Sequence, residues 1–105
     1  MRILHTMLRV GNLEKSIKFY TEIFGMTLLR QKEYPNGKFT LAFLAYWPES
    51  ENTALELTYN WDTESYDPGS GFGHIAIEVD DVYAATNKIR EDGGKIIRDA
   101  GPMNA

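Results

Sequence analysis

The sequence predicts an α+β protein built from paired β-α-β-β-β modules, of which the second is incomplete. Two observations support this prediction. The two histidines of the chain, His5 and His74, begin similar strand-like segments, and a capped amphipathic helix follows each segment. After the first helix the residues alternate in hydrophobicity and are interrupted by turn signals, which is typical of strands.

The first module begins with a predicted strand at Ile3–Val10. Since side chains alternate along a strand, one face of it carries His5, Met7 and Arg9. Asn12 is a predicted helix N-cap, and Gly25 provides the left-handed stop. The apolar stripe of this helix is formed by Leu13, Ile17, Tyr20 and Phe24.

The rest of the first module is predicted to be three strands. The turn residues 34–37 join Thr27–Glu33 to Phe39–Tyr46 as a hairpin, and a second turn near Pro48 leads into Ala54–Tyr59. We therefore expect the first module to span residues 1–60. A linker rich in glycine follows at residues 61–73, and the second module occupies residues 74–105.

The second module repeats the first at a shift of 69 positions. His74–Val79 is the predicted strand, Asp81 the helix cap, and Gly93-Gly94 the stop before another strand at Lys95–Arg98. The turn that corresponds to Asn36-Gly37 would fall on Ala105, so the last strands of this module are missing from the sequence. We expect a shortened form, or a protein that continues beyond Ala105.

The composition describes a folded protein and excludes several kinds of site. Hydrophobic residues make up 43% of the chain, which argues against disorder. The absence of cysteine excludes disulfides and thiolate ligands and fits a cytoplasmic location. A net charge of −4, with both signs interspersed, offers no surface for nucleic acid, and no apolar run is long enough for a membrane span. Four aromatic residues are expected to pack in the core, namely Phe19, Tyr20, Phe24 and Phe43.

The candidate metal ligands are His5, Glu56 and His74. Glu56 lies among apolar neighbours on the strand Ala54–Tyr59, where a carboxylate needs a cationic partner such as an arginine or a metal ion. If the strands of both modules line one concave sheet, two imidazoles and one carboxylate converge. This set suits Ni²⁺, Zn²⁺, Co²⁺ or Fe²⁺ and leaves positions free for a substrate oxygen.

Arg9 and Asn60 are predicted to lie at the rim of this site, on the faces of His5 and Glu56. They could hold a carboxylate and an amide of a ligand. The ordinary alternatives are a surface ion pair for Arg9 and a turn residue for Asn60. Likewise, a single histidine on a half-buried strand is more often a hydrogen-bonded residue than a ligand.

Four stretches of the chain resemble the vicinal oxygen chelate superfamily and, within it, the bacterial glyoxalase I (lactoylglutathione lyase) family. The likeness extends from Met1 to Met103 and is carried by Leu4–Val10, Ile17–Tyr20, Leu55–Trp61 and Gly73–Ala76. It implies a metal bound at His5, Glu56 and His74, with nickel typical of the short bacterial type and zinc or cobalt as alternatives. A fourth ligand, a glutamate that is the usual base, is expected beyond Ala105, so a chain ending there is expected to lose activity.

The resemblance also implies a reaction. The substrate is the hemithioacetal of methylglyoxal and glutathione, and the product is S-D-lactoylglutathione. Glu56 is the second candidate for the base, and Arg9 and Asn60 are expected to contact glutathione. Homodimers with sites shared between subunits are expected.

Two rival functions remain open on the same fold. One is a metal-free small-molecule-binding protein of the drug-resistance type, which would not need His5, Glu56 and His74 together. The other is a different metal-dependent enzyme, such as an epimerase or a ring-cleaving dioxygenase. The coexistence of the three candidate ligands favours metal chemistry over the first of these.

Overall fold

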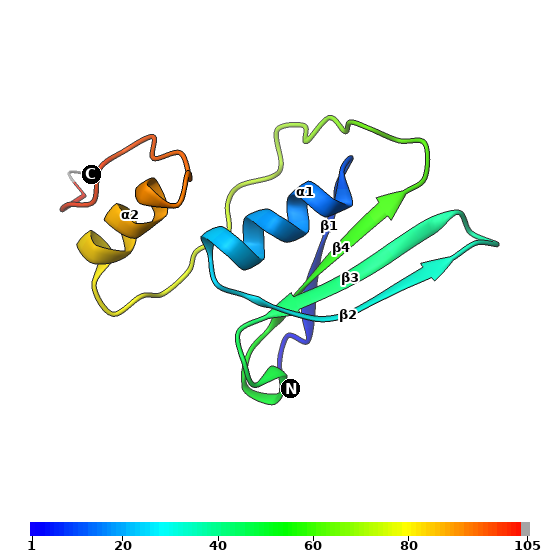
Figure 1. The fold of residues 1–105 in the computed structure, drawn as a ribbon, viewed down its shortest axis with the longest axis horizontal. Helices are drawn as coiled ribbons and strands as arrows, with labels where there is room; N and C mark the ends of the chain where they lie inside the picture. Colours follow the sequence, from blue (N-terminus) through cyan, green and yellow to red (C-terminus); the bar gives the residue numbers. More distant parts are fainter. Residues whose placement is uncertain (104–105) are drawn as a thin grey trace. The chain divides into compact units, whose positions relative to one another are not determined.

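A computed structural model describes residues 1–103 of the chain, which divides into two compact units, Met1–Pro68 and Gly69–Ala105. Figure 1 shows the elements of both units. In chain order these are β1 (His5–Arg9), α1 (Leu13–Lys18), the π-helical turn η1 (Phe19–Ile23), β2 (Thr27–Tyr34), β3 (Phe39–Ala45), the 3₁₀ turn η2 (Glu49–Glu51), β4 (Ala54–Asn60) and α2 (Val82–Glu91).

The first unit has the predicted β-α-β-β-β order. Its four strands form one mixed sheet in the order β1-β4-β3-β2. β1 runs parallel to β4, whereas the β2–β3 and β3–β4 pairs are antiparallel. The strand with the candidate ligand Glu56, β4, is therefore central, and the strand with His5 is its neighbour.

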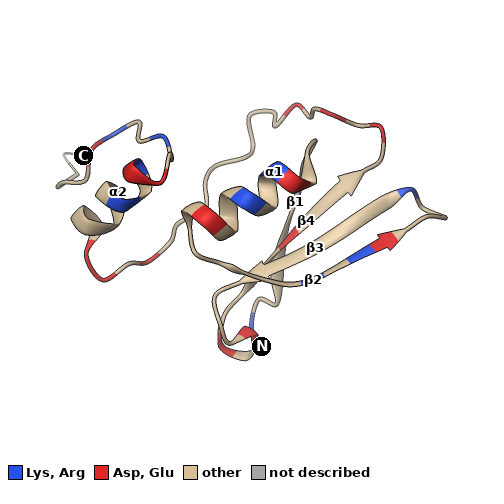
Figure 2. Cartoon of the chain, viewed as in Figure 1, with Lys and Arg blue, Asp and Glu red and all other residues tan. Residues whose placement is uncertain are grey.

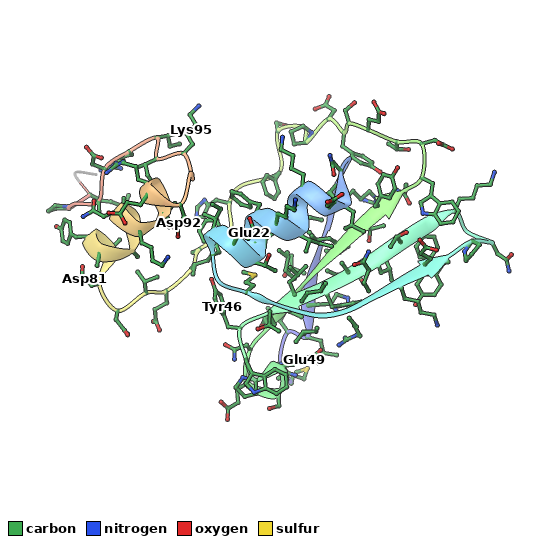
Figure 3. All side chains as sticks on the ribbon, in the orientation of Figure 1. Glu22, Tyr46, Glu49, Asp81, Asp92 and Lys95 are labelled. Atoms are coloured by element: carbon green, nitrogen blue, oxygen red, sulfur yellow. The ribbon has the colours of Figure 1, made fainter. Side chains whose placement is uncertain are left out.

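Both ends of the first helix follow the predicted signals. The side chain of Asn12 accepts a hydrogen bond from the Lys15 amide at 3.0 Å, and Gly25 has a φ of +69°. Between these residues the helix changes from α to π geometry at Phe19. Beyond its end, the Tyr46 hydroxyl donates to the Phe24 carbonyl at 2.7 Å, which joins the helix to the end of β3 (Tyr46 is labelled in Figure 3).

The core lies between α1 and one face of the sheet. Leu44 and Leu57 are fully buried there with Ala42 and Leu55. Leu8, Leu13, Ile17 and Tyr20 pack against this cluster, as the helical and strand spacing predicted. The opposite face, which we call the open face, carries His5, Met7 and Arg9 of β1, Glu56, Thr58 and Asn60 of β4, and Phe39, Leu41 and Phe43 of β3.

The second unit contains α2, which begins at the predicted cap. Asp81 accepts hydrogen bonds from the amides of Tyr83 and Ala84 at 2.9 and 3.1 Å, and Gly93 ends the helix with a φ of +95°. The predicted strands at His74–Val79 and Lys95–Arg98 are wrong, because neither segment has strand structure. A strand requires a hydrogen-bonded neighbour, and within residues 1–103 no strand pairs with either segment.

Charged side chains of both signs are interspersed along the elements of each unit, as the sequence indicated (Figure 2). Examples on α1 and α2 are the pairs Glu14–Lys18 and Lys88–Asp92 at i, i+4 spacing. No helix in the described part of the chain has both the length and the apolar character needed to cross a lipid bilayer.

Candidate metal centre on the open face

His5 and Glu56 lie next to each other on the open face. In the parallel β1–β4 pair His5 is in register with Ala54 and Met7 with Glu56, so the two candidate ligands are diagonal neighbours on one face. His5 Nε2 and Glu56 Oε1 are 3.9 Å apart. The Glu56 side chain is 14% exposed and the His5 side chain 45% exposed. The pair is thus open to solvent on the His5 side, where a ligand could enter.

The separation of this pair is close to that of two ligands of one divalent ion. Donor atoms at about 2.1 Å from a tetrahedral ion are roughly 3.4 Å apart. The two atoms are 3.9 Å apart, so they would approach each other by about 0.5 Å on binding, and they are too far apart to form a hydrogen bond that would compete for their lone pairs. Imidazole nitrogen and carboxylate oxygen are the donor types that Ni²⁺, Zn²⁺ and Co²⁺ accept.

The third candidate ligand, His74, belongs to the second unit. It is exposed and lies in the irregular segment that precedes α2. Within residues 1–103 no group of three His, Asp or Glu side chains forms a metal-binding cluster. The structure therefore brings together two members of the set, His5 and Glu56, and the role of His74 stays a prediction.

β1 and β4 are parallel, and Arg9 and Asn60 are their last residues. Both residues therefore lie at the same end of the open face. Arg9 is in register with Thr58, which is two residues before Asn60 on β4. Among the described residues no ion pair engages Arg9, so the surface ion pair considered for it does not form there. Asn60 donates its side-chain amide to the Tyr66 hydroxyl at 3.1 Å and also begins a turn, because its carbonyl accepts from the Thr63 amide.

Phe43 is a neighbour of this pair that the sequence analysis missed. The expectation that it packs in the core is wrong, because it lies on the open face directly opposite Glu56 in the β3–β4 ladder. Its ring is 5.5 Å from the His5 ring at an interplanar angle of 82°. Both faces of β3 carry apolar residues, which concealed the alternation. The only signal available was that Phe43 is in phase with Phe39 and Leu41 and out of phase with Leu44.

The other aromatic predictions have mixed outcomes. Tyr20 packs against the buried cluster as expected, and its burial raises the pKa of its hydroxyl. Phe19 is exposed, so its predicted burial is wrong, although it makes edge-on ring contacts with Tyr20 and Phe24. The helical spacing explains this exposure, because Phe19 directly precedes Tyr20 and so lies outside the apolar stripe formed by Leu13, Ile17 and Tyr20.

A groove of about 760 Å³ lies on the other side of the sheet, beside α1. Its lining includes Asn12, Ile17, Gln31, Glu33 and Tyr59. None of the candidate ligands or rim residues contributes to this groove. The chemistry predicted from the sequence is therefore assigned to the open face and not to this hollow.

Comparison with known proteins confirms the fold and identifies the family of the chain. Residues 2–104 match the model of the Glyoxalase/Bleomycin resistance protein/Dioxygenase superfamily. The lactoylglutathione lyase of Neisseria meningitidis is 61% identical over 103 residues, which are 98% of this chain and 75% of that protein. The chain belongs to the lactoylglutathione lyases of this superfamily. A probable lactoylglutathione lyase of Synechocystis and the enzyme of Escherichia coli O157:H7 are 59% and 53% identical over the same share of the chain.

Solved lactoylglutathione lyases, also called glyoxalase I, have the same fold. Glyoxalase I from Zea mays superposes with a TM-score of 0.92 at 52% identity, covering 98% of this chain and 37% of the maize chain. The trypanothione-dependent enzyme of Leishmania major has a TM-score of 0.80 at 52% identity, covering 87% of this chain and 66% of that one. A methylmalonyl-CoA epimerase at 22% identity, with a TM-score of 0.54, shares the fold alone.

Proposed function

We propose that this protein isomerises the hemithioacetal of methylglyoxal and glutathione to S-D-lactoylglutathione, and so takes part in methylglyoxal detoxification. The relatives named lactoylglutathione lyase, at 53–61% identity, support this activity. The single observation that supports it most is the placement of His5 and Glu56, which puts a nitrogen and an oxygen donor 3.9 Å apart on a solvent-accessible sheet face.

His5, Glu56 and His74 would hold a divalent metal ion. Our first candidate is Ni²⁺, with Zn²⁺ and Co²⁺ as alternatives, because two imidazoles and a carboxylate suit all three. When bound, the ion supplies positive charge beside the oxygens of the substrate, which lowers the cost of removing the neighbouring proton.

The residues of the chain supply the remaining steps. The Glu56 carboxylate is a proton acceptor on the central strand, and its 14% exposure shields it from bulk water. We assign it the role of base, which takes the proton from one carbon and returns it to the next. Arg9 and Asn60 are on the same face and would hold the charged and amide groups of glutathione.

We propose a first module at residues 1–60, a linker at residues 61–73 and a second module at residues 74–105.

A homodimer with shared sites would cover the open face, on which Met7 is an exposed apolar residue. Light scattering coupled to gel filtration tests the dimer, and cell fractionation tests a cytoplasmic location.

The test of the reaction is thioester formation, followed by absorbance, after Ni²⁺, methylglyoxal and glutathione are added to the purified protein. Glu56→Gln removes the carboxylate while keeping its shape, and we expect its rate to fall by about 100-fold or more. Glu33→Gln is the matched control, because Glu33 is a carboxylate of the same sheet that lines the groove beside α1. If both variants keep a measurable wild-type rate, Glu56 has no catalytic role.

The same samples also test the alternative function, a metal-free small-molecule-binding protein. A wild-type protein that is folded and binds none of Ni²⁺, Zn²⁺ and Co²⁺ would overturn the proposed metal-dependent reaction. Such a result would favour the resistance-type function.

A further inference from the structure

A β-bulge brings Arg30 to the open face. In the β2–β3 ladder Leu28 is in register with Leu44, whereas Arg30 is in register with Phe43, so Leu29 is an extra residue on β2. Without this extra residue Leu29 would lie opposite Phe43, and Arg30 would lie on the face that packs against α1. Bulges often redirect a side chain in this way.

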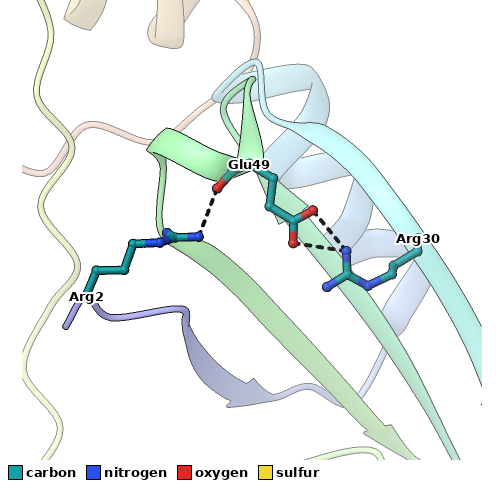
Figure 4. A network of polar contacts seen from close by, with 3 residues as sticks. All are labelled: Arg2, Arg30 and Glu49. Atoms are coloured by element: carbon teal, nitrogen blue, oxygen red, sulfur yellow. Dashed lines mark hydrogen bonds and ion pairs between the residues drawn. The ribbon is translucent and has the colours of Figure 1, made fainter.

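Once on the open face, Arg30 is held from two sides. Its Nη1 donates to both carboxylate oxygens of Glu49, at 3.0 and 3.1 Å, and its guanidinium lies 4.3 Å from the centre of the Phe43 ring. Arg2 contacts the backbone carbonyl of the same Glu49 at 3.5 Å, so two arginines converge on η2 (Figure 4). A planar guanidinium held by a carboxylate is well suited to stacking on an aromatic face.

Phe43 connects this cluster to the candidate metal pair. It is in register with Arg30 on one side and with Glu56 on the other, and its ring meets the His5 ring nearly at a right angle. Among the described residues no hydrogen bond fixes the His5 imidazole. Beside the 3.9 Å approach to Glu56, the edge-on packing against Phe43 restricts how this half-exposed ring rotates.

We propose that Arg30 is a positioning residue, which holds Phe43 and through it keeps the His5 imidazole turned toward Glu56. This inference rests on the proposed function only where it concerns metal affinity. A ligand that is already oriented loses less rotational freedom on binding, so an ion binds more tightly to it. Arg30 would thus favour cation binding although it is itself a cation.

The sign of the effect distinguishes positioning from charge. If Arg30 acted by charge alone, its removal would relieve repulsion and strengthen cation binding at the nearby pair. Positioning predicts the reverse. Arg30→Gln should weaken Zn²⁺ or Ni²⁺ binding by about threefold to tenfold, which is at or below the usual effect of removing a group that orients a ligand. Arg30→Lys keeps the charge but loses the planar stack, and we expect an intermediate loss.

Lys32→Gln is the matched control. Lys32 is a cation on the same strand and the same face, two residues beyond Arg30, and it lies 5.1 Å from the ring of Tyr34 instead of Phe43. Its removal should leave metal affinity unchanged. Because Arg30 and Lys32 are both exposed, neither variant is expected to unfold the protein, and circular dichroism checks this.

The experiment combines calorimetric titration of Zn²⁺ and Ni²⁺ with nuclear Overhauser contacts between the His5 and Phe43 rings in the metal-free protein. We expect Arg30→Gln, but not Lys32→Gln, to weaken those contacts and the affinity together. Equal or tighter metal binding with unchanged ring contacts in Arg30→Gln would overturn the positioning role. If the wild type binds no ion, the proposed function fails, and the ring contacts alone still decide the role of Arg30.

Discussion

Residues His5–Val10 and His74–Val79 carry the same sequence pattern, and only the first segment forms a strand. β1 is paired along its length with β4, and its extension donates the Val10 amide to the Thr58 carbonyl at 3.0 Å. The segment at His74–Val79 has no strand partner within residues 1–103, and Ile75 and Val79 are exposed. Alternating hydrophobicity therefore gives a segment the capacity to be a strand, but a neighbouring strand is needed to realise it.

The same difference separates the two candidate histidines. Pairing of β1 with β4 places His5 beside Glu56 and, through β3, beside Phe43. Within residues 1–103, His74 has no such neighbours defined by a sheet. A site on a sheet is thus assembled by the strand partners of its residues, and a repeated histidine alone does not assemble it.

The largest effect expected from this contrast is on stability. Leu57→Ala removes a fully buried side chain from the centre of the sheet and should cost about 2–5 kcal/mol of unfolding free energy. Ile75→Ala changes an exposed residue of the unpaired segment and should alter stability by no more than about 0.5 kcal/mol. Urea unfolding followed by far-ultraviolet circular dichroism measures both. Equal losses would mean that His74–Val79 is packed as tightly as the sheet.

Much of the first unit could be predicted because its signals are local. Asn12, Gly25 and the turn at residues 34–37 mark the ends of elements without reference to distant residues. The adjacency of β1 and β4, the bulge at Leu29 and the position of Phe43 depend on pairing between distant segments. The pairing of Arg30 with Glu49 is equally non-local. Local patterns did not contain this information.

A second contrast concerns two glycines. A Cβ on Gly11 would clash with the backbone carbonyl of Glu64, so the chain after β4 passes too close to Gly11 for any other residue. Gly11→Ala should displace that chain and cost about 1–3 kcal/mol. Gly71→Ala, in the second unit, meets nothing within 4 Å and is the matched control, with little expected change. Urea unfolding compares them, and an unaffected Gly11→Ala would show that the close approach is absent in solution.

The smallest expected effect is a pH dependence of the first unit. Burial raises the pKa of Tyr20 and of Tyr46 above the ordinary value of 10.0, because it disfavours the ionised form. The folded state then holds these protons more tightly than the unfolded state. The resulting stabilisation is fully present below pH 10 and is lost as the pH rises through the folded-state pKa values.

Tyr46→Phe removes one of these titrating groups. Its unfolding free energy should fall less steeply above pH 10 than that of the wild type, in urea titrations at a series of alkaline pH values. Tyr83→Phe changes an exposed tyrosine of the second unit and serves as the control. A Tyr46→Phe slope identical to that of the wild type would contradict the burial of this hydroxyl.

We propose, as stated above, that His5, Glu56 and His74 bind one divalent ion. Titration of Zn²⁺ into the protein, followed by proton–nitrogen correlation spectra of the imidazoles, tests it directly because only two histidines contribute signals. We predict that the His5 and His74 rings shift together and saturate at one ion per chain, and that Glu56→Gln weakens this binding. Two rings that shift independently, or an affinity that Glu56→Gln leaves unchanged, would contradict the claim.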